Sequence, residues 1–187
     1  AADHRPSSLF EYHGKTEQGI LLELAERGCV RQYLRESASS PPATLLLQWA
    51  QQAAEALVFC HDNDVLHGDI NCSNFFLNAD LDLKVGDYTS SSFDEPTGSV
   101  YSTTHQLPDA DFNTHETEIF AFGSGLYEMV IGRAPYDQLE DEKVESLFRQ
   151  KQFPDVSSAI VLGETISRCW TLQFSSMKDV LQAIKAE

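Results

Sequence analysis

The sequence contains few positive charges. Its 187 residues include 13 Lys and Arg against 29 Asp and Glu, which gives a formal net charge of −16. Proteins that bind nucleic acid usually carry a clustered basic surface, because contacts to phosphates supply much of their affinity. The cations here are scattered along the chain. We therefore expect no nucleic-acid partner and interpret the acidity as a solvated surface.

Long apolar runs and paired cysteines are lacking too. No stretch approaches the roughly 20 apolar residues of a membrane span, and the first residues show no signal-peptide pattern. The four cysteines are Cys29, Cys60, Cys72 and Cys169. They lie far apart and form no Cys-x-x-Cys pair, which predicts reduced thiols. We expect no membrane partner and a cytoplasmic location.

The remaining composition is that of a folded protein. A hydrophobic content of 42% with 22% charged residues is typical of globular chains, and 187 residues suit one domain. Apolar residues recur at helical spacing from Ala43 to Cys60, with Trp49 in the stripe, and predict a helix with a buried face. Further helices are predicted at about residues 117–131, 140–150, 157–170 and 175–186.

Short apolar runs predict strands between these helices. The runs 9–12 and 20–24 flank a glycine-marked turn and favour a two-stranded antiparallel unit. Further runs are too short for helices and predict small strands. They lie at residues 65–66, 75–77 and 83–85. The polar stretch 89–113 has little periodicity and predicts a long loop.

Polar residues surround these small strands in an order that suggests phosphoryl transfer. His67, Asp69 and Asn74 lie in a loop between two apolar runs, and Asp87 follows the next run, so a hairpin would bring it beside Asn74. Transfer from ATP needs a carboxylate that orients the attacking hydroxyl and oxygen ligands that hold Mg²⁺. The alternative is that these Asp and Asn residues only cap turns, as they do in most loops.

Several segments resemble protein kinases. HGDINCSN at 67–74 resembles the catalytic loop HRDLxxxN, and GDYT at 86–89 resembles the DFG segment. The stretch that contains Glu118 and Gly123 resembles the F-helix pattern, with Glu118 at its Asp position. Upstream, GILLELAERGCVRQYLRE resembles the fifth strand, the hinge and the start of the D-helix, and the later Cys-Trp pair resembles the H-helix motif.

The resemblance implies an α+β, protein-kinase-like fold for residues 1–187 as a single domain. Residues 1–25 would be a remnant of the N-lobe strands and hinge, and residues 26–187 the helical C-lobe. The N-lobe would be largely missing, with its earlier strands and helix before Ala1. A Gly-rich loop and a strand lysine are not found, since the only lysine before the catalytic loop is Lys15, in a polar turn.

The resemblance also implies roles for individual residues. Asp69 would be the catalytic base, and Asn74 and Asp87 would be Mg²⁺ ligands in the cofactor site. Backbone groups near Glu23 and Ala25 would meet the adenine of ATP. The partners implied are ATP and a protein that serves as substrate or binding partner.

Other positions concern packing or depart from the kinase pattern. His67 and Tyr88 would be packing residues. Gly68 replaces the Arg of the loop, and Asn71 replaces the lysine of serine/threonine kinases. Thr89 replaces the Gly of DFG, which permits backbone angles that a β-branched residue resists.

Three functions remain open at this stage. The first is Mg-ATP-dependent phosphoryl transfer to protein hydroxyls. The second is a pseudokinase that acts as a protein-interaction module. The third is a small-molecule phosphotransferase, because HGDxxxxN also resembles the loop of aminoglycoside and choline phosphotransferases.

Overall fold

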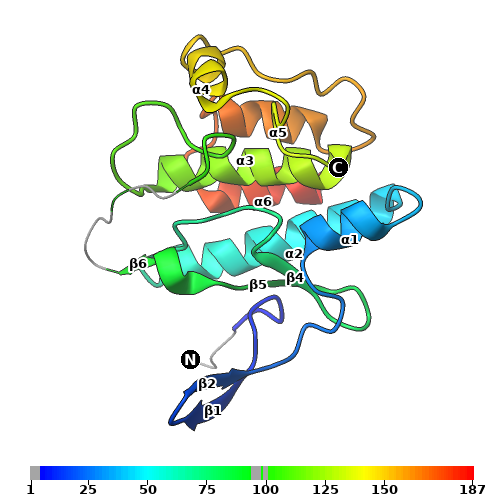
Figure 1. The fold of residues 1–187 in the computed structure, drawn as a ribbon, viewed down its shortest axis with the longest axis vertical. Helices are drawn as coiled ribbons and strands as arrows, with labels where there is room; N and C mark the ends of the chain where they lie inside the picture. The colour runs from blue at the N-terminus through cyan, green and yellow to red at the C-terminus, as the bar shows by residue number, and fades with distance from the viewer. Residues whose placement is uncertain (1–4, 94–97, 99–100) are drawn as a thin grey trace.

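The computed structural model describes residues 5–93, 98 and 101–187. Helices form most of the regular secondary structure, and a two-stranded hairpin projects from one end of the helical body (Figure 1). The helices are α1 (Val30–Glu36), α2 (Ala43–Asp62), α3 (His115–Ile131), α4 (Asp141–Arg149), α5 (Gly163–Trp170) and α6 (Met177–Lys185). The predicted α+β class is confirmed.

Three small antiparallel sheets contain all the named strands of the described residues. The projecting hairpin pairs β1 (Tyr12–Thr16) with β2 (Gly19–Leu22). The second sheet pairs β3 (Val65–Leu66) with β6 (Ser92–Phe93), and the third pairs β4 (Phe75–Leu77) with β5 (Leu83–Val85). A 3-10 turn, η1 (Tyr88–Ser90), lies between β5 and β6.

The core is built around α2 and α3. The stripe predicted on α2 is buried, and Trp49 is inaccessible to solvent and donates its Nε1–H to the Leu81 carbonyl at 2.7 Å. Helix α3 is buried on nearly every side. It begins with a capping box between Thr114 and Thr117 and ends at Gly132, whose φ of 86° suits a glycine. The loops that connect the small strands lie on these two helices.

Helices α3 and α5 approach closely at a glycine. A Cβ on Gly123 would lie 2.6 Å from the Cβ of Cys169, so any larger residue would push the helices apart. Beside this contact, Trp170 Nε1 donates a hydrogen bond to Ser124 Oγ at 3.0 Å. The glycine singled out from the sequence therefore has a packing role.

Strands β3, β4 and β5 have the predicted bounds, but the first strand was misplaced. Residues 9–12 were expected to form it, whereas Leu9 forms a parallel bridge with Val85, and Val85 N donates to Ser8 O at 2.8 Å. The hairpin therefore starts at Tyr12, and most of the expected turn is strand. The bridge from Leu9 to Val85, 76 positions away, decided the structure at Leu9, not the local apolar pattern.

Two other elements differ from the sequence prediction. Residues 89–93, expected as loop, contain part of η1 and strand β6. Helix α5 begins at Gly163 and not near residue 157, because Leu162 has a left-handed backbone with φ 66°. The side chain of Glu187 caps this start by accepting hydrogen bonds from Leu162 N at 2.5 Å and Thr165 Oγ1 at 2.7 Å.

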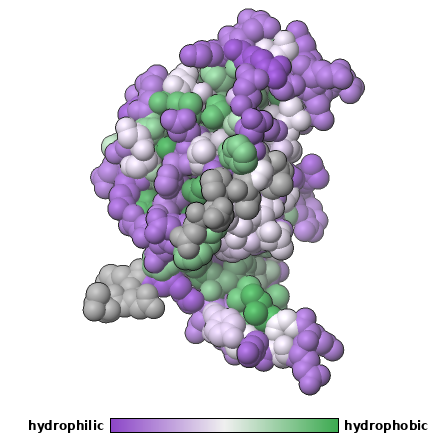
Figure 2. Space-filling model, turned by 90° about the vertical axis from the view of Figure 1, so that its left-hand side faces the viewer, coloured by the Kyte–Doolittle hydropathy of each residue, from purple (hydrophilic) through white to green (hydrophobic). Residues whose placement is uncertain are grey.

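The hairpin leaves apolar side chains in solvent. Tyr12 and Ile20 of the hairpin are 54% and 66% exposed, and Leu24, just after it, is 73% exposed. Figure 2 shows apolar surface at the junction between the hairpin and the helical body and on the hairpin itself. Within the described residues, none of the helices combines the length and apolar character needed to cross a lipid bilayer.

Candidate active site

The loop between β3 and β4 is held by a buried histidine. His67 Nε2 donates to the Gly86 carbonyl at 2.8 Å, and His67 Nδ1 accepts from the N–H of Asp69 at 3.3 Å. The imidazole ring packs against Tyr88, with centroids 4.8 Å apart. The packing contact expected for His67 and Tyr88 is present, and it joins the loop to the segment after β5.

The carboxylate of Asp69 is oriented by two amides. Asn74 Nδ2 donates to Asp69 Oδ2 at 2.8 Å and to the Asp69 carbonyl at 2.7 Å, while Asn71 Nδ2 donates to Asp69 Oδ1 at 2.9 Å. Asn71 is held in turn by Ser73 N, which donates to its Oδ1 at 2.8 Å. Because the amide nitrogen of Asn74 faces Asp69, its Oδ1 is the atom left for another ligand.

Asp87 is brought to this loop by the β4–β5 hairpin. Gly86 N donates to the Asn74 carbonyl at 3.0 Å, so Asp87 directly follows a residue bonded to Asn74. Asp87 has a left-handed backbone, with φ 58° and ψ 70°, and an exposed side chain. Its Oδ1 accepts from Thr89 Oγ1 at 2.6 Å. The backbone conflict expected at Thr89 does not occur, because Thr89 lies in η1 and the unusual angles fall on Asp87.

A cavity of about 970 Å³ lies between the hairpin and the helical body. Glu23 and Ala25 line one side, and Asp87 and Thr89 line another. The remaining lining includes Leu9, Phe10, Ile20, Leu22, Leu24, Phe59, Val65, Phe76 and Tyr88. Its size and mostly apolar wall with a few polar groups are typical of small-molecule sites. Asp69 and Asn74 are not among its lining residues.

The Glu23 side chain is fixed at the edge of this cavity. Its Oε2 accepts from Lys84 Nζ at 2.9 Å and from Glu11 N at 3.1 Å. Partial burial raises the pKa of Glu23, but the hydrogen bonds from Lys84 and Glu11 outweigh it and leave the pKa below its ordinary value. The side chain therefore stabilises the segment that precedes Ala25.

Comparison with known proteins identifies the family of the chain. The model of the protein tyrosine and serine/threonine kinase family matches residues 9–184. The chain belongs to the protein kinase family. It is 26% identical over 137 residues to the serine/threonine-protein kinase pkpA of Phycomyces blakesleeanus, which covers 68% of this chain and 22% of that protein.

Two further curated relatives are mammalian kinases. Human testis-specific serine/threonine-protein kinase 1 is 23% identical over 192 residues, with 84% of this chain and 52% of that protein covered. Mouse serine/threonine-protein kinase PLK2 is 27% identical over 151 residues, with 75% of this chain and 22% of that protein covered. The chain thus spans from about a fifth to about half of the length of these kinases.

A buried carboxylate on α3 joins the loop between β3 and β4 to two other segments. Glu118, fully buried, accepts hydrogen bonds at 2.8 Å from Gly68 N, Tyr101 Oη and His61 Nε2. Burial raises the pKa of Glu118, but the hydrogen bond and charge of His61, together with the Gly68 N–H, bring it below its ordinary value. His61, near the end of α2, is therefore a direct partner of this carboxylate.

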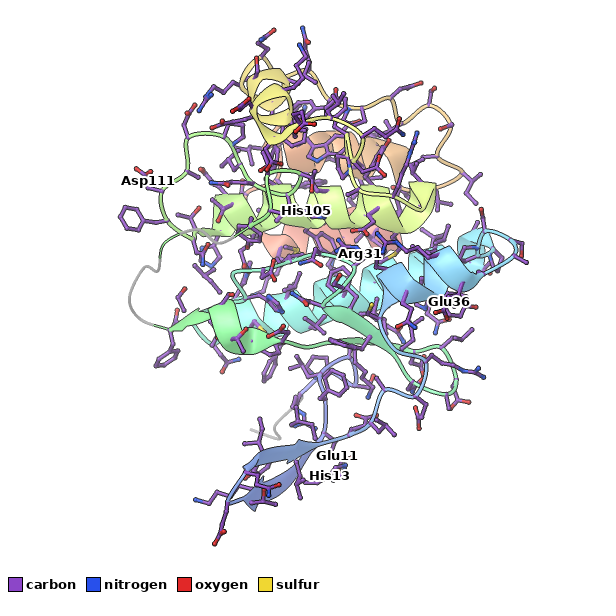
Figure 3. All side chains as sticks on the ribbon, viewed as in Figure 1. Glu11, His13, Arg31, Glu36, His105 and Asp111 are labelled. Carbon is purple, nitrogen blue, oxygen red and sulfur yellow. The ribbon has the colours of Figure 1, made fainter. Side chains whose placement is uncertain are left out.

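A second buried carboxylate was missed by the sequence reasoning. Arg31 of α1 contacts Glu128 of α3 through Nε, donates from Nη2 to Glu128 Oε2 at 2.8 Å, and donates from Nη1 to Ser73 Oγ at 2.6 Å. His105 approaches the same carboxylate, with Nε2 3.6 Å from Oε2. Figure 3 shows Arg31 and His105 against α3 at the centre of the molecule. Glu128 within a largely apolar helix could have indicated this pair, because buried carboxylates almost always have a partner.

Gly68 is required by its surroundings in this kinase chain. Its φ is 82°, and a Cβ there would overlap the Ser90 carbonyl and lie 2.8 Å from Asn113 Nδ2. The segment after Asp87 thus occupies the space that a side chain at position 68 would need. The departure from HRD is accommodated by close packing between the β3–β4 loop and η1.

Proposed function

We propose that this chain performs Mg-ATP-dependent phosphoryl transfer to protein hydroxyls, with Asp69 as the catalytic base. The observation that carries the proposal is the hydrogen-bonded series Asp69–Asn74–Gly86, which supports one site for Asp69, Asn74 and Asp87. In the same proposal residues 1–25 are a small-lobe remnant and hinge, and residues 26–187 the large lobe of a single kinase-like domain.

The proposed work of Asp69 is to orient and deprotonate the acceptor. Each of its carboxylate oxygens accepts one amide hydrogen bond, and a carboxylate oxygen has further lone pairs for an incoming hydroxyl. The hydroxyl oxygen would bond to the γ-phosphorus as the bond to ADP breaks, and Asp69 would take the proton. The amides fix the carboxylate before the acceptor arrives.

The metal-binding part of the proposal rests on oxygen chemistry. The Oδ1 of Asn74 and the Oδ2 of Asp87 are hard oxygen ligands of the type Mg²⁺ prefers. When bound, the ion would neutralise charge on the phosphates. The residues present therefore fit a magnesium ion, with Asn74 and Asp87 as the groups that would hold it.

The nucleotide part of the proposal rests on the cavity. Within the described part of the chain, no hydrogen bond uses the Glu23 carbonyl or the Ala25 N–H, and both residues line the same cavity as Asp87. An adenine edge needs such backbone donors and acceptors. The four cysteines are free, which supports a reducing, cytoplasmic setting for the proposed reaction.

A second candidate function is a protein-interaction module without transfer. It is favoured because, among the described residues, no lysine lines the cavity, and Asn71 stands where serine/threonine kinases have a lysine. Losing one preorganised charge donor typically costs about 3 kcal/mol in the transition state. Under this alternative the domain folds and binds a protein but transfers no phosphate.

The proposal is tested by nucleotide-dependent thermal stability, followed by a transfer assay. ATP with Mg²⁺ at 100 times its Kd should stabilise the chain by about 2.7 kcal/mol, and Asp87→Asn should remove this effect while Asp80→Asn, on the exposed β4–β5 turn, keeps it. Transfer to a mixed protein substrate should then be lost in Asp69→Ala. A cooperative melt that no nucleotide moves would refute the proposal in favour of the interaction module.

A further inference from the structure

The carboxylate of Asp87 is held by a side chain that the kinase pattern does not provide. Thr89 Oγ1 donates to Asp87 Oδ1 at 2.6 Å, and Thr89 N approaches the same oxygen at 3.4 Å. A distance of 2.6 Å is that of a charge-assisted O–H···O⁻ hydrogen bond, which is stronger than a neutral one. The Gly that kinases place at this position has no hydroxyl with which to make it.

Asp87 has little else to fix its side chain. It is exposed, and within the described residues its carboxylate accepts hydrogen bonds from Thr89 alone. An exposed carboxylate that must be ordered when it binds a cation loses rotamer freedom at that moment. A hydroxyl that already selects one rotamer removes part of this cost.

We infer that Thr89 is a positioning residue for the metal-binding carboxylate. Its hydroxyl holds Oδ1 of Asp87 and leaves Oδ2 as the oxygen that would bind a divalent cation beside the cavity that both residues line. This inference rests on the proposed function, because it takes Asp87 as the metal ligand.

The competing explanation is purely local. Asp87 is the N-cap of η1 and accepts from Thr89 N, so the hydroxyl would merely complete a turn. In that case removal of the hydroxyl lowers local stability but leaves cation binding unchanged. The two explanations differ in what they predict for a metal titration.

The test compares three single variants of the full chain. Thr89→Val keeps the shape and removes the hydroxyl, whereas Thr89→Ser keeps the hydroxyl. Thr171→Val is the matched control, since Thr171 is an exposed threonine whose hydroxyl bonds the Ser167 carbonyl at the end of α5, in another part of the fold.

Two measurements are made on each protein. Three-bond couplings at Asp87 report its χ1 rotamer without metal, and titration with Mn²⁺ in the presence of a non-hydrolysable ATP analogue, followed by electron paramagnetic resonance, gives the Kd for the ion. In Thr89→Val the Asp87 side chain should populate several χ1 rotamers, and the Kd for Mn²⁺ should rise by about five- to tenfold. Thr89→Ser and Thr171→Val should remain within about twofold of the parent chain.

Each contrary outcome has a definite meaning. Unchanged Mn²⁺ binding in Thr89→Val, with binding intact in the parent chain, would overturn the inference and leave the proposed function standing. Equal weakening in Thr89→Val and Thr89→Ser would overturn it as well, because the hydroxyl is then not the cause. A parent chain that binds no Mn²⁺ with the analogue would overturn the proposed function and, with it, the metal role of Thr89.

Discussion

The backbone N–H of Gly68 donates to Glu118 Oε1 at 2.8 Å, so a carboxylate in the first turns of α3 holds the residue directly before Asp69. The same carboxylate accepts from Tyr101 and His61. Since burial also raises the pKa of Tyr101, its hydroxyl remains a donor over the whole physiological range. The β3–β4 loop, the end of α2 and the segment before α3 are therefore all bonded to the carboxylate of Glu118.

Removing this carboxylate should be costly. Glu118→Ala leaves three buried donors without an acceptor, and we expect a loss of about 3–5 kcal/mol in the free energy of unfolding. Glu116→Ala, an exposed glutamate in the same first turn, should change it by less than about 0.5 kcal/mol. Urea unfolding of both variants checks this, and equal effects would contradict the anchoring role.

A side chain at position 68 should not be tolerated. Gly68→Ala combines the cost of a left-handed backbone, about 1–2 kcal/mol, with an overlap against Ser90 and Asn113 that adds about 1–3 kcal/mol. Gly132→Ala has a similar φ of 86° and nothing within 4 Å, so only the backbone cost applies. Chemical denaturation should separate the two variants, and a Gly68→Ala protein as stable as Gly132→Ala would show that the overlap relaxes.

The two glycines within α3 should respond with opposite signs. Alanine gains up to about 1 kcal/mol over glycine in a helix. At Gly123 the overlap with Cys169 should exceed that gain, whereas at Gly125 the nearest atom is 3.5 Å away, on Phe75. We expect Gly123→Ala to lower the melting temperature and Gly125→Ala to leave it equal or higher. A rise in both would mean that α5 moves aside without cost.

Acid should weaken the fold through Glu128. Burial raises the pKa of this carboxyl, but Arg31 and His105 outweigh it and lower the pKa from 4.5 to about 2. Because the folded pKa lies below the unfolded one, the stabilisation is complete above about pH 4.5 and is lost as the pH falls towards 2. The part due to Glu128 is about 3 kcal/mol.

This contribution is isolated by comparison with a variant. The free energy of unfolding is measured by urea between pH 6 and pH 2.5 for the parent chain and for Glu128→Gln. The gap between the two proteins should narrow as the pH falls through the window given by the pKa values. A gap that stays constant would assign the acid sensitivity to other carboxylates, such as Glu118.

Short-range patterns of apolar residues predicted several helices and strands correctly. The periodic stripe of α2 and the short runs of β3, β4 and β5 were found where expected. Helix α2 buries its predicted face, and strands β4 and β5 are largely buried. The sequence also predicted that Asp87 would lie near Asn74, because the hairpin pairs β5 with β4.

Distant contacts decided what the sequence did not predict. Leu9 pairs with Val85, and Glu187 caps a helix that begins at Gly163. Arg31 and Glu128 are 97 positions apart, and nothing near either residue in the chain names its partner. These contacts depend on which helices and strands pack against each other. Neither the spacing of apolar residues nor the propensity of single residues contains that information.

The exposed apolar hairpin also affects how the chain behaves in solution. Unpaired strand edges with apolar side chains are sites for self-association, and the net charge of −16 opposes it by mutual repulsion. Added salt screens that repulsion, and acidification towards the pI of 4.6 removes it. The purified chain should therefore resist aggregation best at low ionic strength and neutral to alkaline pH. High salt or acidic pH should cause association through the hairpin, which a rise in turbidity would report.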